Sequence, residues 1–187
     1  MKNRKFFCVV FGIISILLSS SLTVLAEVRL PRVIGSHMVL QQEIPLPIWG
    51  WAEPSEQVKV VFRGAEAAAA ADMDGKWMVK LPAQQAGGPF EMTIAGKNTI
   101  QLTDILVGEV WIGSGQSNME MGIGVIMNGA QEAAAANYPN IRLFMVPNVP
   151  AGQPQSDCEG SWQVCSPETV AAGGWGGFSA TAYFFGR

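Results

Sequence analysis

A single serine follows a run of apolar and small residues near the middle of this chain of 187 residues. The run begins at residues 105–107, continues through 108–114, and leads into the hexapeptide Gly115-Gln116-Ser117-Asn118-Met119-Glu120. An apolar strand that ends in small residues is how many hydrolases expose a nucleophile, because glycines let the backbone turn sharply and let a substrate approach. Ser117 is therefore a candidate nucleophile, and the alternative is a polar turn after a buried strand.

The spacing around Ser117 differs from two familiar patterns. Met119 stands where the Gly-x-Ser-x-Gly elbow has its second glycine, and Asn118 stands where a dinucleotide loop has its third. A serine hydroxyl attacks an ester only when a base takes its proton, and the developing oxyanion needs donors already in place. The flanking side chains of Gln116 and Asn118 could donate hydrogen bonds, and a backbone N–H at a strand-to-helix turn could supply another.

The base for such a serine is the open question, because His37 is the only histidine in the chain. We interpret His37 as a partly exposed turn residue, and its chance proximity to Ser117 is the alternative. Asp104 and Glu120 are acidic residues near Ser117 in sequence, but a carboxylate is a weak base for a serine at neutral pH. Asp104 is therefore interpreted as a turn residue and Glu120 as a polar residue that organises the site.

Residues 1–26 have the pattern of a secretory signal peptide that is cut after Ala26. Basic residues precede an apolar run over 6–18 that is short for a membrane span, although an uncleaved anchor is the alternative. Removing the three basic residues of this segment leaves nine of the 12 Lys and Arg against 15 Asp and Glu, a net charge of −6. We expect a secreted or periplasmic protein that binds neither nucleic acid nor, after cleavage, a membrane.

The part of the chain over 27–106 has the pattern of a β-sandwich, because short alternating runs are separated by turn residues at regular spacing. The alanine-rich segment 65–71 has high helix propensity. We nevertheless predict a strand there, paired with 77–81 in a hairpin, because little room for a helix remains between two turns. The other predicted strands are 38–40, 46–51, 58–62, 90–94 and 99–102.

The part over 107–187 changes its periodicity and resembles the truncated start of an α/β domain. It stops before enough strands for a covered sheet have appeared. After the serine turn, the predicted elements are a helix over 130–136, a buried strand over 141–146, a long loop over 147–177, and a helix over 180–185 with Ser179 as its N-cap.

Two cysteines, Cys158 and Cys165, remain after the signal peptide. In an oxidising compartment a pair at this spacing can close a small loop, and we prefer a disulfide to the alternative of two free thiols. Neither cysteine has a histidine nearby in sequence, so we expect neither a cysteine nucleophile nor a zinc site.

The segment Gly108-Glu109-Val110-Trp111 followed by 115–120 resembles the first block of the sialate O-acetylesterases, which are SGNH (GDSL-like) hydrolases. The similarity extends to motifs on both sides and covers essentially the whole chain after the signal peptide. These motifs are His37-Met38-Val39-Leu40-Gln41, Trp49-Gly50-Trp51-Ala52, Asp74-Gly75-Lys76-Trp77, Asn98-Thr99-Ile100, Trp162, Cys165-Ser166-Pro167-Glu168 and Phe178-Ser179-Ala180.

The resemblance implies a mixed fold, with an N-terminal β-sandwich followed by a flavodoxin-like SGNH domain. It implies a serine esterase that acts on O-acetyl groups of sialic acids or related glycans without a metal or an organic cofactor. It places the nucleophile at Ser117, whose own N–H would be one oxyanion donor. Gln116, Asn118 and Glu120 would organise the site, and the stretch 176–179 could hold a further donor.

The chain also departs from the family pattern. The family's base lies in an Asp-x-x-His block near the C-terminus, and this sequence contains no such block. We therefore expect an N-terminal fragment that is nearly inactive alone. The alternatives are an acetylxylan-type carbohydrate esterase and a non-catalytic carbohydrate-binding module, in which exposed tryptophans would stack on sugars although most should lie in the core. The candidates for stacking are Trp49, Trp51, Trp77 and Trp175.

Overall fold

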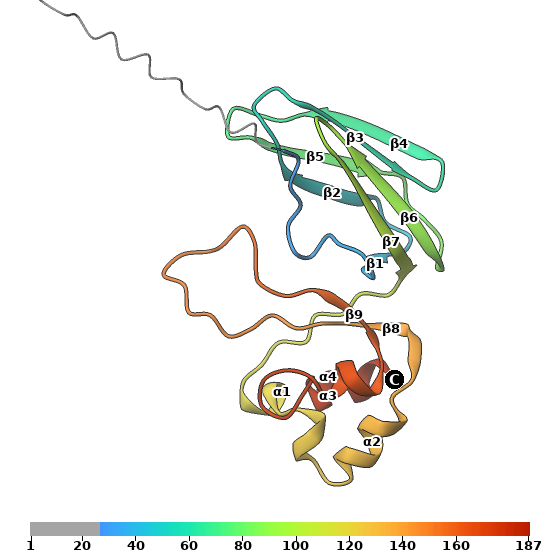
Figure 1. The fold of residues 1–187 in the computed structure, drawn as a ribbon, viewed down its shortest axis with the longest axis vertical. Coiled ribbons are helices and arrows are strands. Elements are labelled where there is room, and N and C mark those ends of the chain that lie inside the picture. The colour runs from blue at the N-terminus through green and yellow to red at the C-terminus, as the bar shows by residue number, and fades with distance from the viewer. Residues whose placement is uncertain (1–26) are drawn as a thin grey trace, which may run out of the picture.

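The structure is a computed structural model that describes residues 27–187 (Figure 1). The signal peptide predicted over 1–26 lies outside the described residues. A sheet-rich part that extends to Gly108 is followed by a smaller part with short helices and two strands, so the fold is mixed and rich in sheet. Within residues 27–187, no helix is both long and apolar enough to cross a lipid bilayer.

The sheet-rich part contains seven strands in two sheets. They are β1 (Val39–Gln41), β2 (Leu46–Trp51), β3 (Gln57–Phe62), β4 (Ala65–Ala70), β5 (Lys76–Leu81), β6 (Gly87–Ala95) and β7 (Thr99–Gly108). The larger sheet has the order β1-β7-β6-β3-β4, in which β1 is parallel to β7 and all other neighbours are antiparallel. The smaller sheet pairs β2 with β5 in antiparallel register.

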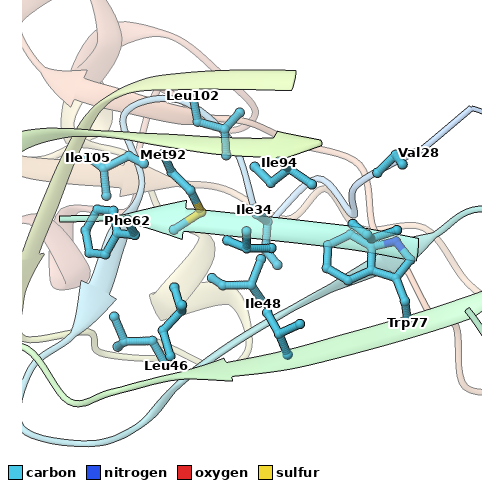
Figure 2. Packing of buried hydrophobic residues seen from close by; sticks show 14 of the residues in the cluster. Val28, Ile34, Leu46, Ile48, Phe62, Trp77, Met92, Ile94, Leu102 and Ile105 are labelled. Carbon is cyan, nitrogen blue, oxygen red and sulfur yellow. The ribbon is translucent and has the colours of Figure 1, made fainter. Parts of the chain in front are cut away.

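The two sheets share one apolar core. Side chains on a strand alternate between its faces, so β3 buries every second residue from Val58 to Phe62, and β5 does the same from Trp77 to Leu81. Each aliphatic or aromatic side chain buried in this way contributes roughly 1.5–3 kcal/mol. Figure 2 shows Leu46, Ile48 and Trp77 of the smaller sheet together with Phe62, Met92, Ile94, Leu102 and Ile105 of the larger one.

The alanine-rich segment forms a strand, β4, as the sequence predicts. The predicted pairing is wrong, because β4 pairs with β3 in the larger sheet while β5 pairs with β2 in the smaller one. The turn between β4 and β5 therefore carries the chain from one sheet to the other. Asp72 fixes this turn, since its Oδ1 accepts hydrogen bonds from the N–H groups of Asp74 and Lys76 at 2.9 and 2.8 Å.

Strand β7 joins two apolar segments, 99–102 and 105–107, into one strand with a bulge. Leu102 pairs with Met92 and Ile105 pairs with Phe90, so two residues of β7 lie opposite one residue of β6. Asp104 in the bulge has φ +54°, a left-handed conformation that few residues other than glycine adopt. The bulge therefore changes the direction of the Asp104 side chain.

After β7 an irregular stretch over 109–116 leads to short elements around a second, smaller core. The helix expected over 130–136 is confirmed, and so is the cap at Ser179, whose Oγ accepts a hydrogen bond from the Ala182 N–H at 3.2 Å. The elements are α1 (Ser117–Glu120), the 3-10 helix η1 (Ile123–Val125), α2 (Gly129–Ala135), β8 (Tyr138–Phe144), β9 (Trp162–Cys165), α3 (Pro167–Ala171) and α4 (Ala180–Gly186).

Two predictions for this part are wrong in detail. The long loop expected over 147–177 contains β9 and α3, and β9 pairs antiparallel with β8. Helix α3 begins with a capping box, in which the Ser166 Oγ accepts from the Thr169 N–H and the Ser166 N–H donates to the Thr169 Oγ1. The strand expected over 141–146 is β8, in which Leu143 is buried as a whole residue and the Arg142 side chain is also buried.

The preferred interpretation of a disulfide is also wrong, because Cys158 and Cys165 are both free thiols. Cys165 is buried in the second core, and Cys158 is half-buried. Desolvation raises the pKa of both thiols, so they stay protonated at neutral pH and are poor nucleophiles.

Gly50 in β2 offers a test of how closely the N-terminal segment packs on the smaller sheet. A Cβ atom at this position would overlap the backbone oxygen of Arg29 and would lie 3.1 Å from the Trp77 ring. We expect Gly50→Ala to lower the free energy of unfolding by about 1–3 kcal/mol, measured as a lower urea midpoint. Gly35→Ala is the control, because its Cβ would meet only the Arg32 oxygen at 3.8 Å. Equal midpoints for the two variants would contradict this packing.

Candidate functional site

Ser117 is the first residue of α1, and it is exposed. The strand that was expected to position it ends at Gly108, and the irregular stretch over 109–116 separates the two. Strand β7 is instead committed to the larger sheet, where it pairs with β1 and β6. The position of Ser117 therefore depends on what α1 contacts in the second part of the chain.

Helix α1 is held against the start of α4, beside which it lies in Figure 1. The Thr181 Oγ1 donates a hydrogen bond to the Asn118 backbone oxygen at 3.1 Å, and the Ser179 Oγ donates to the Met119 sulfur at 3.4 Å. An isolated bridge joins Gly122 to Ser179 just after α1. These contacts fix the α1 backbone while the Ser117 side chain remains exposed.

The predicted site residues 116–120 come together on this exposed turn. The N–H of Ser117 lies at the first helical position, where no intrahelical acceptor exists, and no described residue accepts a hydrogen bond from it. The side chains of Gln116 and Asn118 are likewise without a hydrogen-bond partner among residues 27–187. The Glu120 carboxylate accepts a hydrogen bond from the Asn148 Nδ2 at 2.9 Å, which links α1 to the loop after β8.

The stretch 176–179, in which the family resemblance suggests a further oxyanion donor, packs against the chain after α1. The Gly176 oxygen accepts a hydrogen bond from the Gly124 N–H at 2.7 Å, and the Phe178 oxygen accepts one from the Ile123 N–H at 3.0 Å. The Phe178 N–H donates to the Val170 oxygen at 2.9 Å and is therefore not free for a substrate. This stretch supports η1 and the end of α1.

No described acid or base is hydrogen-bonded to the Ser117 hydroxyl. His37 lies in the turn just before β1 and is bound to another residue. Its Nδ1 is 2.7 Å from the Asp104 Oδ2. Its side chain is 45 % exposed in a turn, which confirms the interpretation of His37 as a partly exposed turn residue. Among residues 27–187, no three His, Cys, Asp or Glu side chains gather closely enough to hold a metal ion.

The interpretation of Asp104 as a turn residue is wrong, because Asp104 lies in the bulge of strand β7 and is the centre of an ion cluster. Its Oδ1 accepts a hydrogen bond from the Arg142 Nη2 at 2.9 Å while its Oδ2 faces His37. The Arg142 side chain is only 3 % exposed. Partial burial tends to raise the pKa of Asp104, but the His37 hydrogen bond and the Arg142 charge outweigh it, so the pKa lies below its usual value. No sequence pattern connects these three residues.

The tryptophans suggested for sugar stacking differ in exposure. Trp77 is buried in the first core, which agrees with the expectation that most of these rings are structural. Trp49 and Trp51 are half-buried, and Trp175 is 51 % exposed. Trp175 is therefore the only one of the four with a largely open ring.

Comparisons with curated proteins give relatives along most of the chain, although no family model matches it. It is 31 % identical over 195 residues to the mouse protein named sialate O-acetylesterase, in an alignment that covers 95 % of this chain and 36 % of the mouse protein. It is 33 % identical over 176 residues to the human protein of the same name, covering 85 % and 34 % of the two chains. The chain thus spans about a third of the length of the curated relatives it matches.

A solved structure is similar over the same extent. The crystal structure of a carbohydrate acetylesterase from Xanthomonas citri matches with a TM-score of 0.79 and 39 % sequence identity. The match covers 84 % of this chain and 36 % of that one. Because most of the described residues take part, both the sheet-rich part and the part that carries Ser117 contribute to the likeness.

Asp104→Asn tests the ion cluster, since it leaves the buried Arg142 guanidinium without its counter-ion. We expect a loss of roughly 1–3 kcal/mol in the free energy of unfolding at pH 7, measured by urea titration. The folded-state pKa of Asp104 is lowered, so its contribution is complete above the unfolded pKa of about 3.9 and is lost as pH falls through the folded value.

The difference in stability between the wild type and Asp104→Asn should therefore shrink once the pH falls below about 4. Asp74→Asn is the matched control, because the Asp74 side chain is 79 % exposed and lies 4.0 Å from the Lys76 Nζ. We expect that control to change stability by less than about 0.5 kcal/mol. A difference for Asp104→Asn that does not depend on pH would contradict the assignment.

Proposed function

Because the chain is homologous to sialate O-acetylesterases over most of its length, we propose that it forms part of a serine esterase that removes acetyl groups from glycans. The names of these homologues and of the structural neighbour describe carboxylic ester hydrolases. The observation that carries the proposal is this homology, which includes the part of the chain where Ser117 begins a fixed and exposed helix.

In this proposal the two sheets form the β-sandwich expected over 27–106, and residues 107–187 form the start of the SGNH domain. The shared core between the smaller and larger sheets supports the first assignment. The short helices around the antiparallel pair β8 and β9, together with the match to the acetylesterase structure, support the second.

The proposed reaction uses Ser117 twice. Its Oγ attacks the acetyl carbonyl carbon while its proton passes to a base, and the Ser117 N–H donates to the oxyanion that forms. Collapse breaks the bond to the sugar oxygen, which takes a proton and leaves as an alcohol. Water then attacks the acetyl-serine ester, so acetate is released and the Ser117 hydroxyl is restored. Gln116 and Asn118 would orient the substrate, and Glu120 would hold the turn through Asn148.

The base in this reaction is proposed to come from residues beyond those that the structure describes. Neither His37 nor any described carboxylate is hydrogen-bonded to Ser117. The resemblance to the esterase family implies a histidine in an Asp-x-x-His block for this role. A histidine can accept the serine proton near neutral pH, whereas a free carboxylate is too weak a base.

The proposed substrates are acetylated glycans, with O-acetylated sialic acid as the first candidate. The mouse and human relatives are named for sialate. A broader carbohydrate esterase, including one for acetylxylan, is the second candidate, because the Xanthomonas citri protein is 39 % identical and is named only for carbohydrate.

We also propose that the protein is secreted, with cleavage after Ala26. The support is the pattern of residues 1–26 together with the way the chain enters the fold directly afterwards. Val28 is buried, and its N–H donates to the Asn98 Oδ1 at 2.8 Å. A mature protein that starts at Glu27 would keep this anchor, and N-terminal sequencing of the secreted protein would identify that start.

The purified 187-residue chain is expected to be nearly inactive on p-nitrophenyl acetate. Serine hydrolases that have lost a triad member keep about 10³–10⁴-fold catalysis over water when the oxyanion hole and substrate binding survive. Only one oxyanion donor is assigned here, so we expect a rate below that range. Hydrolysis at an ordinary esterase rate would show that a base lies within these residues.

Ser117→Ala tests the nucleophile in the natural gene product, assayed on O-acetylated sialic acid and on acetylated xylan. We expect kcat to fall by at least about 10³-fold on whichever glycan is hydrolysed, because no acetyl-serine can form. Ser114→Ala is the matched control, since this serine is also exposed and lies three positions earlier. Retention of full activity by Ser117→Ala, or an equal loss in the control, would overturn the assignment.

A further inference from the structure

A cavity of about 420 Å³ lies at the junction of the two parts of the chain. One wall is formed by Arg32 and the segment 34–37 before β1, and the other by the segment 160–162 at the start of β9. None of its lining residues belongs to α1 or to the stretch 109–116 that precedes it. Its volume falls within the range of about 300–1,000 Å³ that is typical of ligand pockets. This cavity is therefore a candidate binding site separate from Ser117.

The cavity has a fixed aromatic wall in Trp162. The Trp162 Nε1 donates a hydrogen bond to the Val33 oxygen at 2.8 Å, and its ring packs against Phe144 with centroids 5.3 Å apart. Because the indole is already held in one orientation, little conformational entropy would be lost when a ligand packs against it. Sugar rings present apolar C–H faces, which pack well on an aromatic surface.

The polar wall of the cavity can both donate and accept hydrogen bonds. The His37 Nδ1 is occupied by Asp104, which leaves the Nε2 for a ligand. The Ser36 Oγ accepts from the Thr103 N–H at 3.1 Å, so its own proton remains available for donation. Ser161 adds a second hydroxyl group to the lining. Sugar hydroxyls likewise donate and accept, so these groups match a ring with several hydroxyls.

The charges around the cavity are of both signs and nearly balance. Arg32 carries a positive charge that lies 3.8 Å from Glu159, and its backbone N–H donates to the Asp157 carboxylate at 2.9 Å. Behind His37, the negative charge of Asp104 is paired with the positive charge of Arg142. With no dominant sign, the site has no field that would select an anion. This balance favours a neutral ligand over the carboxylate of an acidic sugar.

A second hollow of about 230 Å³ lies close to the first in sequence. It is lined by Pro31, Val33 and Trp49 on one side and by residues 155–158 on the other. The two hollows therefore lie along neighbouring residues of the same junction.

We propose that the junction cavity binds a neutral sugar ring of the glycan chain, with Trp162 as the stacking platform and His37 and Ser36 as hydrogen-bonding groups. This site would hold the glycan at a point apart from the acetyl group that Ser117 attacks. The choice of a glycan rests on the proposed function, but binding at the cavity does not require the reaction to occur.

The test measures binding by isothermal titration calorimetry to the full chain carrying Ser117→Ala. The neutral probes are the methyl glycosides of galactose, N-acetylgalactosamine and xylose, and the anionic probe is N-acetylneuraminic acid. We expect at least one neutral probe to bind more tightly than the anion, with an affinity that does not change with salt concentration. Trp162→Ala should weaken that binding about tenfold or more, because the stacking surface is lost.

Trp162 also packs against the first core, so Trp162→Ala could weaken binding by disturbing the fold. A second variant therefore tests the cavity without removing this packing. Ser161 is exposed, and Ser161→Trp would fill the cavity from its rim without removing a buried group. We expect this variant to abolish binding while its circular dichroism stays unchanged. Trp175→Ala is the matched control, because it removes an equally large and more open ring outside the cavity, and binding should be retained.

The outcomes separate this inference from the proposed function. Absence of binding by all three neutral probes, tighter binding of the anion, or full binding by Ser161→Trp would each overturn the cavity assignment. Loss of neutral-sugar binding in Trp175→Ala but not in Trp162→Ala would place the site elsewhere and overturn it as well. Because Ser117→Ala cannot turn over, sugar binding in it is measured independently of whether the natural gene product is an esterase.

Discussion

The ion cluster of Asp104 with Arg142 and His37 joins the two parts of the chain around a buried charge. Asp104 belongs to β7 of the larger sheet, and Arg142 belongs to β8 of the second part. The Arg142 side chain is only 3 % exposed, and a buried guanidinium is strongly unfavourable unless a carboxylate is placed against it. The bulge in β7 supplies that placement, at the expense of a left-handed conformation that costs on the order of 1–2 kcal/mol. The strain at Asp104 is thus offset by the pairing that it makes possible.

This junction separates the part of the chain that carries the candidate nucleophile from the sheets. Eight residues lie between the end of β7 at Gly108 and Ser117, and they have no regular structure. The sheets therefore cannot position Ser117 directly, and its backbone is fixed by Thr181 and Ser179 of the second part. Near the junction, the sheet-rich part contributes Arg32 and residues 34–37, which form one wall of the cavity.

Local sequence patterns predicted the helices and strands that neighbouring residues determine. They did not predict pairings and contacts with residues far away in the sequence. The turn residues on both sides of 65–71 left little room for a helix and so predicted the strand at β4, and the hydroxyl of Ser179 predicted the start of α4. The partner of β4 could not be predicted, because local sequence allows β4 to pair equally well with the preceding strand β3 or with the following strand β5. The His37–Asp104 contact spans 67 positions and leaves no local trace. Ser166 followed by Pro167 at the first helical position and by Glu168 in the first turn is the sequence signal that could have identified α3.

His37 links the junction to the proposed sugar site, because its two ring nitrogens face different partners. The Nδ1 is held by Asp104, while the ring also lines the cavity. A carboxylate at Nδ1 fixes both the orientation and the tautomer of an imidazole, so the Nε2 is presented to a ligand in a defined direction. The contact that joins the two parts of the chain therefore also prepares the cavity between them. In the proposed esterase, Ser117 would carry the chemistry and this junction would hold the sugar, so His37 would serve recognition and the serine would require a different base.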